Sequence, residues 1–288
     1  MADSMQPEHL LGHVQDAYYF EVPRFLASDG KVLIPQIFGA RLEMTEHGYE
    51  AHGFGLSKFM VLEVVAALLL VLLFIPLARR MAGGPAPRGR LWNLFEGILL
   101  YLRDEVARPA IGKHDADKFL PFLWTLFFFV LTCNLLGMLP WSGSPTGALA
   151  TTGALAAVAF LVTITAGMSK LGPVRFWTAQ VPHMDLPLVL AVPLIPMMFA
   201  IEVAGLCIKH VILAVRLLAN MFAGHVVLVV IVSFIAQTAG SVLWYGVVPA
   251  SIFGATALSL LEILVAFLQA YIFTFLSALF IGMAVHPH

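Results

Sequence analysis

The hydrophobic positions of this chain form long uninterrupted runs. A helix that crosses a bilayer needs about 20 apolar residues. Runs of this length predict membrane spans at residues 59–78, 119–139 and 148–168. Two further runs, at about residues 187–243 and 244–285, are longer than an upright span needs. The pattern therefore predicts an all-α membrane protein with about five transmembrane helices, of which the last two are long and tilted.

Prolines and one glycine interrupt the two long runs. Pro187, Pro193 and Pro196 lie near the start of the fourth run and permit a bend there. In the fifth run, Pro249 and Gly254 can break its early part.

Residues 91–107 show a different pattern, in which apolar residues recur at helical spacing among charged ones. A helix of this kind lies on a membrane surface with its apolar stripe against the lipid. We therefore expect a surface helix between the first two spans. The residues of its stripe are Leu91, Leu94, Phe95, Ile98, Leu102 and Val106.

The charges predict an orientation. Residues 79–118 hold eight of the 16 Lys and Arg residues, and basic loops stay in the cytoplasm. This leaves residues 1–58 as an outer-side N-terminal segment and residues 59–288 as the transmembrane domain, with the C-terminus in the cytoplasm. No Lys or Arg precedes Arg24, so we expect no secretory signal. A bacterial inner membrane is the expected location.

Composition narrows the function. The chain is 60% hydrophobic and 11% charged, with a net charge of −1, whereas soluble domains are about 25% charged. This excludes a disordered chain, a nucleic-acid binder and a typical soluble enzyme. No P-loop, HExxH or GxSxG motif occurs. We expect no enzyme activity of its own, no cofactor and no metal; Cys133 and Cys207 are interpreted as core residues, and His286 as part of a tail.

Four formal charges remain after residue 185, namely Glu202, Lys209, Arg216 and Glu262. Each charge at the centre of a bilayer costs about 2.5–3.5 kcal/mol on insertion scales. Such groups are therefore expected to face protein, water or one another.

The first three of these charges are seven residues apart. Seven residues drift about 20° from two full turns of a helix, so Glu202, Lys209 and Arg216 share one face. Asn220 lies about 40° from Arg216, and His225 about 180° from it. The helix thus carries a fixed cation on one face and a titratable imidazole on the other.

Glu262 and Gln269 also lie seven residues apart and share a face. If the last two helices form an antiparallel hairpin, Glu262 approaches His225 and Gln269 approaches Arg216. Other interpretations remain open. Arg216 and Glu262 can be structural ion-pair partners, and His225 can be a core histidine. Lys209 and the adjacent His210 are interpreted as interfacial residues.

Three segments, taken together, resemble the a subunit (subunit 6 type) of F-type ATP synthases. They are VRLLANMFAGH at residues 215–225, LEILVAFLQAYIFTFL at residues 261–276 and TCNLLGMLP at residues 132–140. The resemblance extends from about Phe59 to the end of the chain. Residues 1–58 fall outside it.

The resemblance implies roles for the intramembrane polar residues. Arg216 would be the stator arginine that faces the carboxylates of a rotating c ring, and His225 and Glu262 would relay protons in the outer half-channel. The implied partners are the c ring, the b subunits and the rest of the ATP synthase, with lipids and protons. The supporting polar residues along the path would be Glu202, Asn220 and Gln269.

The chain departs from many bacterial members of that family, which carry the acid and the imidazole in exchanged positions. His225 and Glu262 follow the mitochondrial arrangement, which keeps one of each, and Ala219 stands where Gly is common. An imidazole favours H⁺ over Na⁺, and the direction of the reaction stays open. The alternative function is a secondary transporter in which Arg216 binds an anionic substrate, although that class usually has two related halves.

Overall fold

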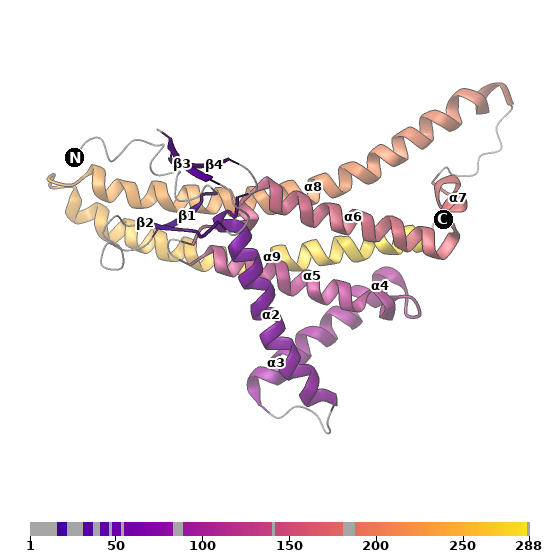
Figure 1. The fold of residues 1–288 in the computed structure, drawn as a ribbon, viewed down its shortest axis with the longest axis horizontal. Coiled ribbons are helices and arrows are strands. Elements are labelled where there is room, and N and C mark those ends of the chain that lie inside the picture. Colours follow the sequence, from indigo (N-terminus) through magenta and orange to yellow (C-terminus); the bar gives the residue numbers. More distant parts are fainter. Residues whose placement is uncertain are drawn as a thin grey trace. The chain divides into compact units, whose positions relative to one another are not determined.

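The computed structural model describes residues 16–21, 31–36, 41–45, 48–52, 55–82, 89–139, 142–180 and 188–286. Five of its helices are long and apolar enough to cross a membrane (Figure 1). Each corresponds to one predicted apolar run, so the predicted all-α membrane class is confirmed. The five helices are α2 (Lys58–Ala82), α5 (Ala116–Gly137), α6 (Leu149–Leu171), α8 (Leu188–Gln237) and α9 (Trp244–Val285).

The strands of the described structure all lie before α2. Strands β1 (Tyr19–Glu21) and β2 (Lys31–Leu33) form one antiparallel pair, and β3 (Arg41–Thr45) and β4 (Gly48–His52) form another. The Asp16 carboxylate accepts a hydrogen bond from the Phe59 amide at 3.2 Å. Because the first amides of a helix lack partners within it, this bond attaches the N-terminal segment to the start of α2.

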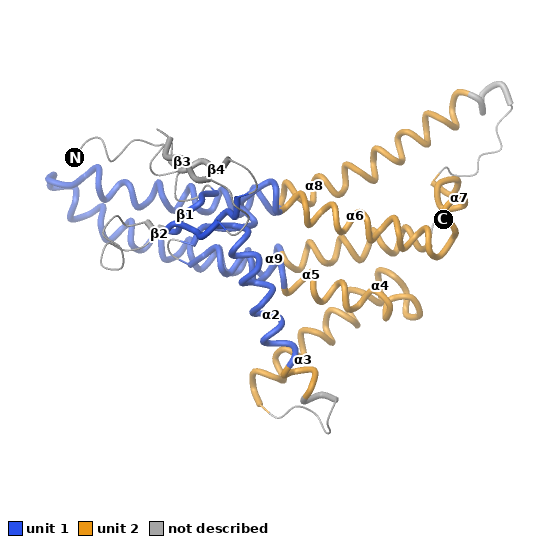
Figure 2. The backbone as a smooth tube through the Cα atoms, viewed as in Figure 1, with its two compact units in different colours: residues 1–75, 129–151, 217–269 blue, residues 76–128, 152–216, 270–288 orange. Residues whose placement is uncertain are grey.

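The chain divides into two compact units, which Figure 2 colours separately. Each of the five long helices contributes residues to both units. Unit 1 consists of Met1–Ile75, Phe129–Thr151 and Leu217–Gln269, and unit 2 of Pro76–Phe128, Thr152–Arg216 and Ala270–His288.

The predicted surface helix is built differently from the expectation. Instead of one helix over residues 91–107, α3 (Arg90–Tyr101) passes into a π-helical turn, η2 (Leu102–Ala107), and then into α4 (Arg108–Ile111). The Arg108 amide reaches back five residues, to the carbonyl of Arg103. The next residue, Pro109, has no amide proton to continue the α-helical pattern, which accounts for the wider turn.

This turn divides the predicted apolar stripe into two parts. Leu102 and Val106 are buried, whereas Leu91 and Leu94 are 70% and 57% exposed. The second half of the stripe therefore packs inside unit 2, and the first half faces outward.

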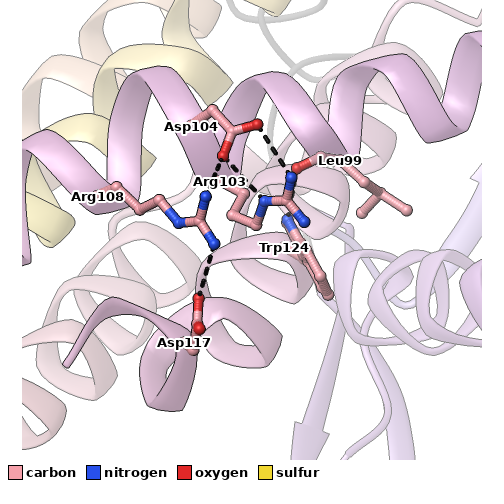
Figure 3. Close-up of polar contacts among 6 residues, drawn as sticks. All are labelled: Leu99, Arg103, Asp104, Arg108, Asp117 and Trp124. Atoms are coloured by element: carbon pink, nitrogen blue, oxygen red, sulfur yellow. Dashed lines mark hydrogen bonds and ion pairs between the residues drawn. The ribbon is translucent and has the colours of Figure 1, made fainter. Parts of the chain in front are cut away.

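Polar contacts hold the turn in place (Figure 3). The Arg103 guanidinium donates two hydrogen bonds of 3.0 Å to Asp104. Arg108 donates to Asp104 at 2.8 Å and lies 3.7 Å from Asp117 of α5. These pairs are partly exposed, so each stabilises the fold only modestly; together they fix how the turn meets α5.

Pro249 and Gly254 do not break the last helix, contrary to the expectation for the fifth run. Helix α9 runs without interruption from Trp244 to Val285 and includes Pro249. Pro249 falls in the second turn, where its ring meets only the first-turn carbonyls. The 36 residues that follow it keep a regular hydrogen-bond ladder.

Candidate functional site

Helices α8 and α9 form an antiparallel hairpin within unit 1, the arrangement on which the expected approach of Glu262 to His225 depended. Ile231 of α8 packs on Gly254 of α9, with 3.9 Å between Ile231 Cγ2 and the point that a Cβ on Gly254 would occupy. Further along, Gly224 packs directly on the carboxylate of Glu262. The register therefore brings Glu262 to the residue that precedes His225.

Gln269 lies further along the hairpin and pairs with Asn220. The side chain of Gln269 is 2% exposed, and its Oε1 accepts a hydrogen bond of 3.2 Å from Asn220 Nδ2. The sequence analysis expected Gln269 to approach Arg216; the hydrogen-bond partner found in unit 1 is Asn220, four residues after Arg216. The arrangement joins two of the predicted supporting residues across the hairpin.

Three polar groups of this hairpin are enclosed but unsatisfied. They are His225 Nε2, Glu262 Oε1 and Gln269 Nε2, which have no hydrogen-bond partner in the part of the chain that the structure describes. A buried polar atom without a partner costs about 1–3 kcal/mol and calls for an explanation. A role in exchanging protons or binding water explains these atoms well, because a group with all its hydrogen bonds formed has no free position for a proton transfer.

Asn134 links the loop between α5 and α6 to the same face of α9. It is completely buried, and its Nδ2 donates to the carbonyl of Ala266 at 3.3 Å. Thr146 Oγ1 donates to Asn134 Oδ1 at 2.7 Å, and Ser144 Oγ lies 2.9 Å from Thr146 Oγ1. Ala266 is one turn after Glu262, so this hydroxyl–amide chain ends beside the polar face. From the sequence, Asn134 was noted only as part of a resembling segment, and this link was not predicted.

A second polar contact that the sequence analysis missed joins α2 to α6. Thr151 Oγ1 donates a hydrogen bond of 2.6 Å to Glu63 Oε1. Glu63 is the only charged residue between Lys58 and Arg79. That isolated carboxylate in a predicted span was the available signal.

Glu202 and Lys209 lie in unit 2, where they line one cavity of about 270 Å³. Gln180 also lines it, and most of the other lining residues are apolar. The predicted shared face of Glu202 and Lys209 is confirmed by this common cavity. Arg216 follows on α8 with an exposed side chain, and it forms no ion pair with the other described residues of unit 2.

His210 contradicts its interpretation as an interfacial residue. It is 3% exposed and lies between the rings of Phe160 and Phe280, with centroid distances of 5.1 and 4.9 Å. His210 Nδ1 is 2.9 Å from the carbonyl of Leu206 on the same helix. An imidazole can thus satisfy one nitrogen locally and bury its ring edges against aromatics, whereas the neighbouring Lys209 stays exposed.

Unit 2 contains an acid–imidazole contact near the end of α9. Asp115, with a side chain 6% exposed, accepts a hydrogen bond of 2.9 Å from Lys170 Nζ and lies 3.4 Å from His286 Nε2. The hydrogen bond from Lys170 keeps the pKa of Asp115 below its usual value. His286, expected to belong to a free tail, is therefore part of an ion cluster. Among the described residues, no group of three or more His, Cys, Asp or Glu side chains could hold a metal ion.

Comparison with known proteins identifies the family. The ATP synthase A chain family matches residues 60–282. The ATP synthase subunit a of Myxococcus xanthus (strain DK1622) is 41% identical over 255 residues, which cover 85% of this chain and 81% of the relative. Subunit a of Chloroherpeton thalassium is 38% identical over 288 residues, covering 97% of this chain and 78% of the relative. Subunit a of Anaeromyxobacter dehalogenans (strain 2CP-C) is 35% identical over 291 residues, covering 97% of this chain and 70% of the relative. The five apolar helices, the polar hairpin of α8 and α9 and these matches agree: the chain belongs to the ATP synthase A chain family.

Proposed function

We propose that this chain is the stator subunit of a rotary ATP synthase that supplies two proton half-channels and the arginine facing the c ring. The observation that carries the proposal is the set of enclosed, unpartnered polar atoms on His225, Glu262 and Gln269. An acid and an imidazole with free positions, on facing segments of an apolar hairpin, are suited to passing protons and poorly suited to holding helices together.

In the outer half-channel, protons pass by way of His225 and Glu262 to a carboxylate of the c ring. Neutralising that carboxylate lets it enter lipid at low cost, because the penalty for burial falls mainly on the charged form. The contact between Gly224 and the Glu262 carboxylate supports this role. It places the acid against the residue that precedes His225.

Arg216 supplies the fixed charge between the half-channels. A guanidinium is a permanently charged group in proteins, so it blocks a direct proton leak and does not relay protons itself. A c-ring carboxylate that reaches Arg216 has its pKa lowered and releases its proton toward the cytoplasm. Glu202, on the same face of α8 and bordering the unit 2 cavity, supports the exit path.

The complex around this chain follows from the same proposal. The partners are the c ring, the b subunits and the remaining ATP synthase subunits, in a bacterial inner membrane. Residues 1–58 form the outer-side segment and residues 59–288 the transmembrane domain, with the C-terminus in the cytoplasm. Each proton that falls through 100 mV supplies about 2.3 kcal/mol, which the ring converts into torque.

Replacing Arg216 by Ala in the complete ATP synthase tests the proposal. In membrane vesicles, we expect ATP synthesis driven by a proton gradient to fall to background, while the complex still assembles. A suitable control is Glu96→Gln, which removes a charge from α3, outside the proposed path. Proton-driven synthesis at wild-type rates in Arg216→Ala would exclude the stator role.

A further inference from the structure

Glu63 is an intramembrane carboxylate to which the proposed function assigns no role. It lies five residues after the start of α2, about 7.5 Å along the helix axis. The surrounding span, Lys58–Arg79, has a mean hydropathy of 2.8. A charge in such a span is costly and is a candidate functional group by default.

The contacts of Glu63 do not resemble those of a structural ion pair. Its hydrogen bond comes from a neutral hydroxyl, Thr151 Oγ1, at 2.6 Å. The nearest cation along α2 is Lys58, about 140° around the helix, and its ammonium lies 3.0 Å from the point that a Cβ on Gly143 would occupy. Glu63 therefore keeps a carboxylate in an apolar span without a neutralising partner among the described residues of unit 1.

The position of Glu63 relates it to the polar face of the hairpin. Thr151 follows Thr146 by five residues, and Thr146 begins the hydrogen-bonded chain through Asn134 to Ala266. On α9, Ala266 lies between Glu262 and Gln269, at spacings of four and three. Residues at such spacings share a helix face. Within unit 1, Glu63 is thus hydrogen-bonded to the start of α6, five residues after Thr146, whose buried polar chain ends at Ala266 between Glu262 and Gln269.

Among the described residues, two groups face Glu63. From α6 the facing group is the Thr151 hydroxyl, and from α5 it is the thiol of Cys133, which is close enough to interact electrostatically with Glu63. A hydroxyl can donate to a carboxylate and accept from a carboxylic acid. Thr151 can therefore serve both protonation states of Glu63.

We propose that Glu63 is a proton-exchanging group at the outer mouth of the proton path, upstream of His225 and Glu262. The inference rests on the proposed function of this chain. The Glu63 carboxylate takes a proton from hydronium, which leaves as water, and one oxygen–hydrogen bond forms on the side chain. The acid then passes that proton to the next water along the path and returns to its charged form.

The test uses the complete ATP synthase in vesicles, with the pH on the outer side varied and the cytoplasmic side held constant. Glu63→Gln retains an oxygen that accepts the Thr151 hydrogen bond but cannot exchange a proton. We expect its rate of proton-driven ATP synthesis to fall several-fold, with the largest loss at high outer pH, where protons are scarce. Glu63→Asp retains a carboxyl group and is expected to recover much of the rate with a shifted dependence on outer pH.

A structural role predicts other results. Thr151→Val removes the hydrogen bond but leaves the carboxyl group. If Glu63 only holds α2 to α6, the rate of proton-driven synthesis should fall equally in Thr151→Val and Glu63→Gln. Equal losses in these two variants, or wild-type rates for Glu63→Gln at every outer pH, would overturn the inference. If Glu63→Gln does not assemble, an unchanged pH profile in Glu63→Asp overturns it as well.

A parallel variant separates this inference from the proposed function. If Glu262→Gln loses proton-driven synthesis and Glu63→Gln does not, the role of Glu63 fails and the proton relay stands. If Glu262→Gln retains full synthesis, the proposed function itself fails. Glu96→Gln serves as the control for removing a carboxylate.

Discussion

A carboxylate and an imidazole occur in both units, as Asp115 and His286 in unit 2 and as Glu262 and His225 in unit 1, but their surroundings differ. In unit 2, the carboxylate of Asp115 has both Lys170 and His286 within 3.4 Å. In unit 1, Glu262 packs on the residue before His225, and both side chains keep an enclosed polar atom without a partner in the described structure. In the first cluster, the carboxylate has both Lys170 and His286 as neighbours, and the cluster attaches the end of α9 to the rest of unit 2. In unit 1, the unpartnered atoms of His225 and Glu262 leave positions at which a proton can be bound or released, as a proton path requires.

The largest expected effect comes from removing the free acid. We expect Glu262→Gln to reduce ATP-driven proton pumping at least tenfold, because the amide cannot exchange a proton. Fluorescence quenching of a pH-sensitive dye in vesicles measures the rate, and co-purification with the other subunits measures assembly. Exchanging His225 and Glu262 is expected to preserve more pumping than either single change to Ala, and equal loss in all three would argue against a relay.

A smaller loss is expected when the acid is displaced but not removed. A Cβ on Gly224 would collide with the Glu262 carboxylate, so Gly224→Ala forces that flexible side chain away from its position. We expect pumping to fall several-fold while the complex assembles normally. Gly254→Ala is the matched control, because the nearest atom is 3.9 Å from its new Cβ. Equal rates for the two variants would show that the position of Glu262 is unimportant.

Asp115→Asn tests the cluster in unit 2. The substitution removes the carboxylate charge that accepts the Lys170 hydrogen bond and lies near His286. We therefore expect a lower midpoint of thermal unfolding for the complex. The pumping rate per assembled complex is expected to stay near wild type. A loss of pumping as severe as that of Glu262→Gln would remove the distinction between the two clusters.

The smallest expected effect is the pH dependence of that stability difference. The pKa of Asp115 is lowered in the fold, mainly by the hydrogen bond from Lys170. Its contribution is therefore complete above the ordinary carboxyl pKa of 3.8 and is lost as the pH falls through the lower folded value. Unfolding midpoints of wild type and Asp115→Asn should converge on acidification below pH 4. A gap that widens there would contradict the assigned sign.

Much of the candidate site could be predicted from helical periodicity. The expectation that Glu262 approaches His225 depended on an antiparallel hairpin, and the hairpin brings Glu262 to the residue before His225. Gln269 was placed on the correct face of α9, but its hydrogen-bond partner Asn220 was not predicted. The offset between two helices depends on side-chain packing at the contact. Packing small residues such as Gly224 against a long side chain sets that offset.

Other features could not be predicted from local patterns. His210 was interpreted as interfacial because it follows Lys209, yet the rings of Phe160 and Phe280 enclose it. These two residues come from α6 and α9, far away in the sequence. The π-helical turn depends on Pro109 together with the packing of Leu102 and Val106 in unit 2.

The sequence by itself determined the five apolar helices and the family, because hydrophobic run length and short motifs are local properties. Tertiary structure alone decided which polar atoms are satisfied. Asn134 meets the carbonyl of Ala266 across 132 residues of sequence, and Thr151 meets Glu63 across 88. A hydrogen bond needs two groups within about 3 Å, and only the packing of distant helices creates or withholds that proximity.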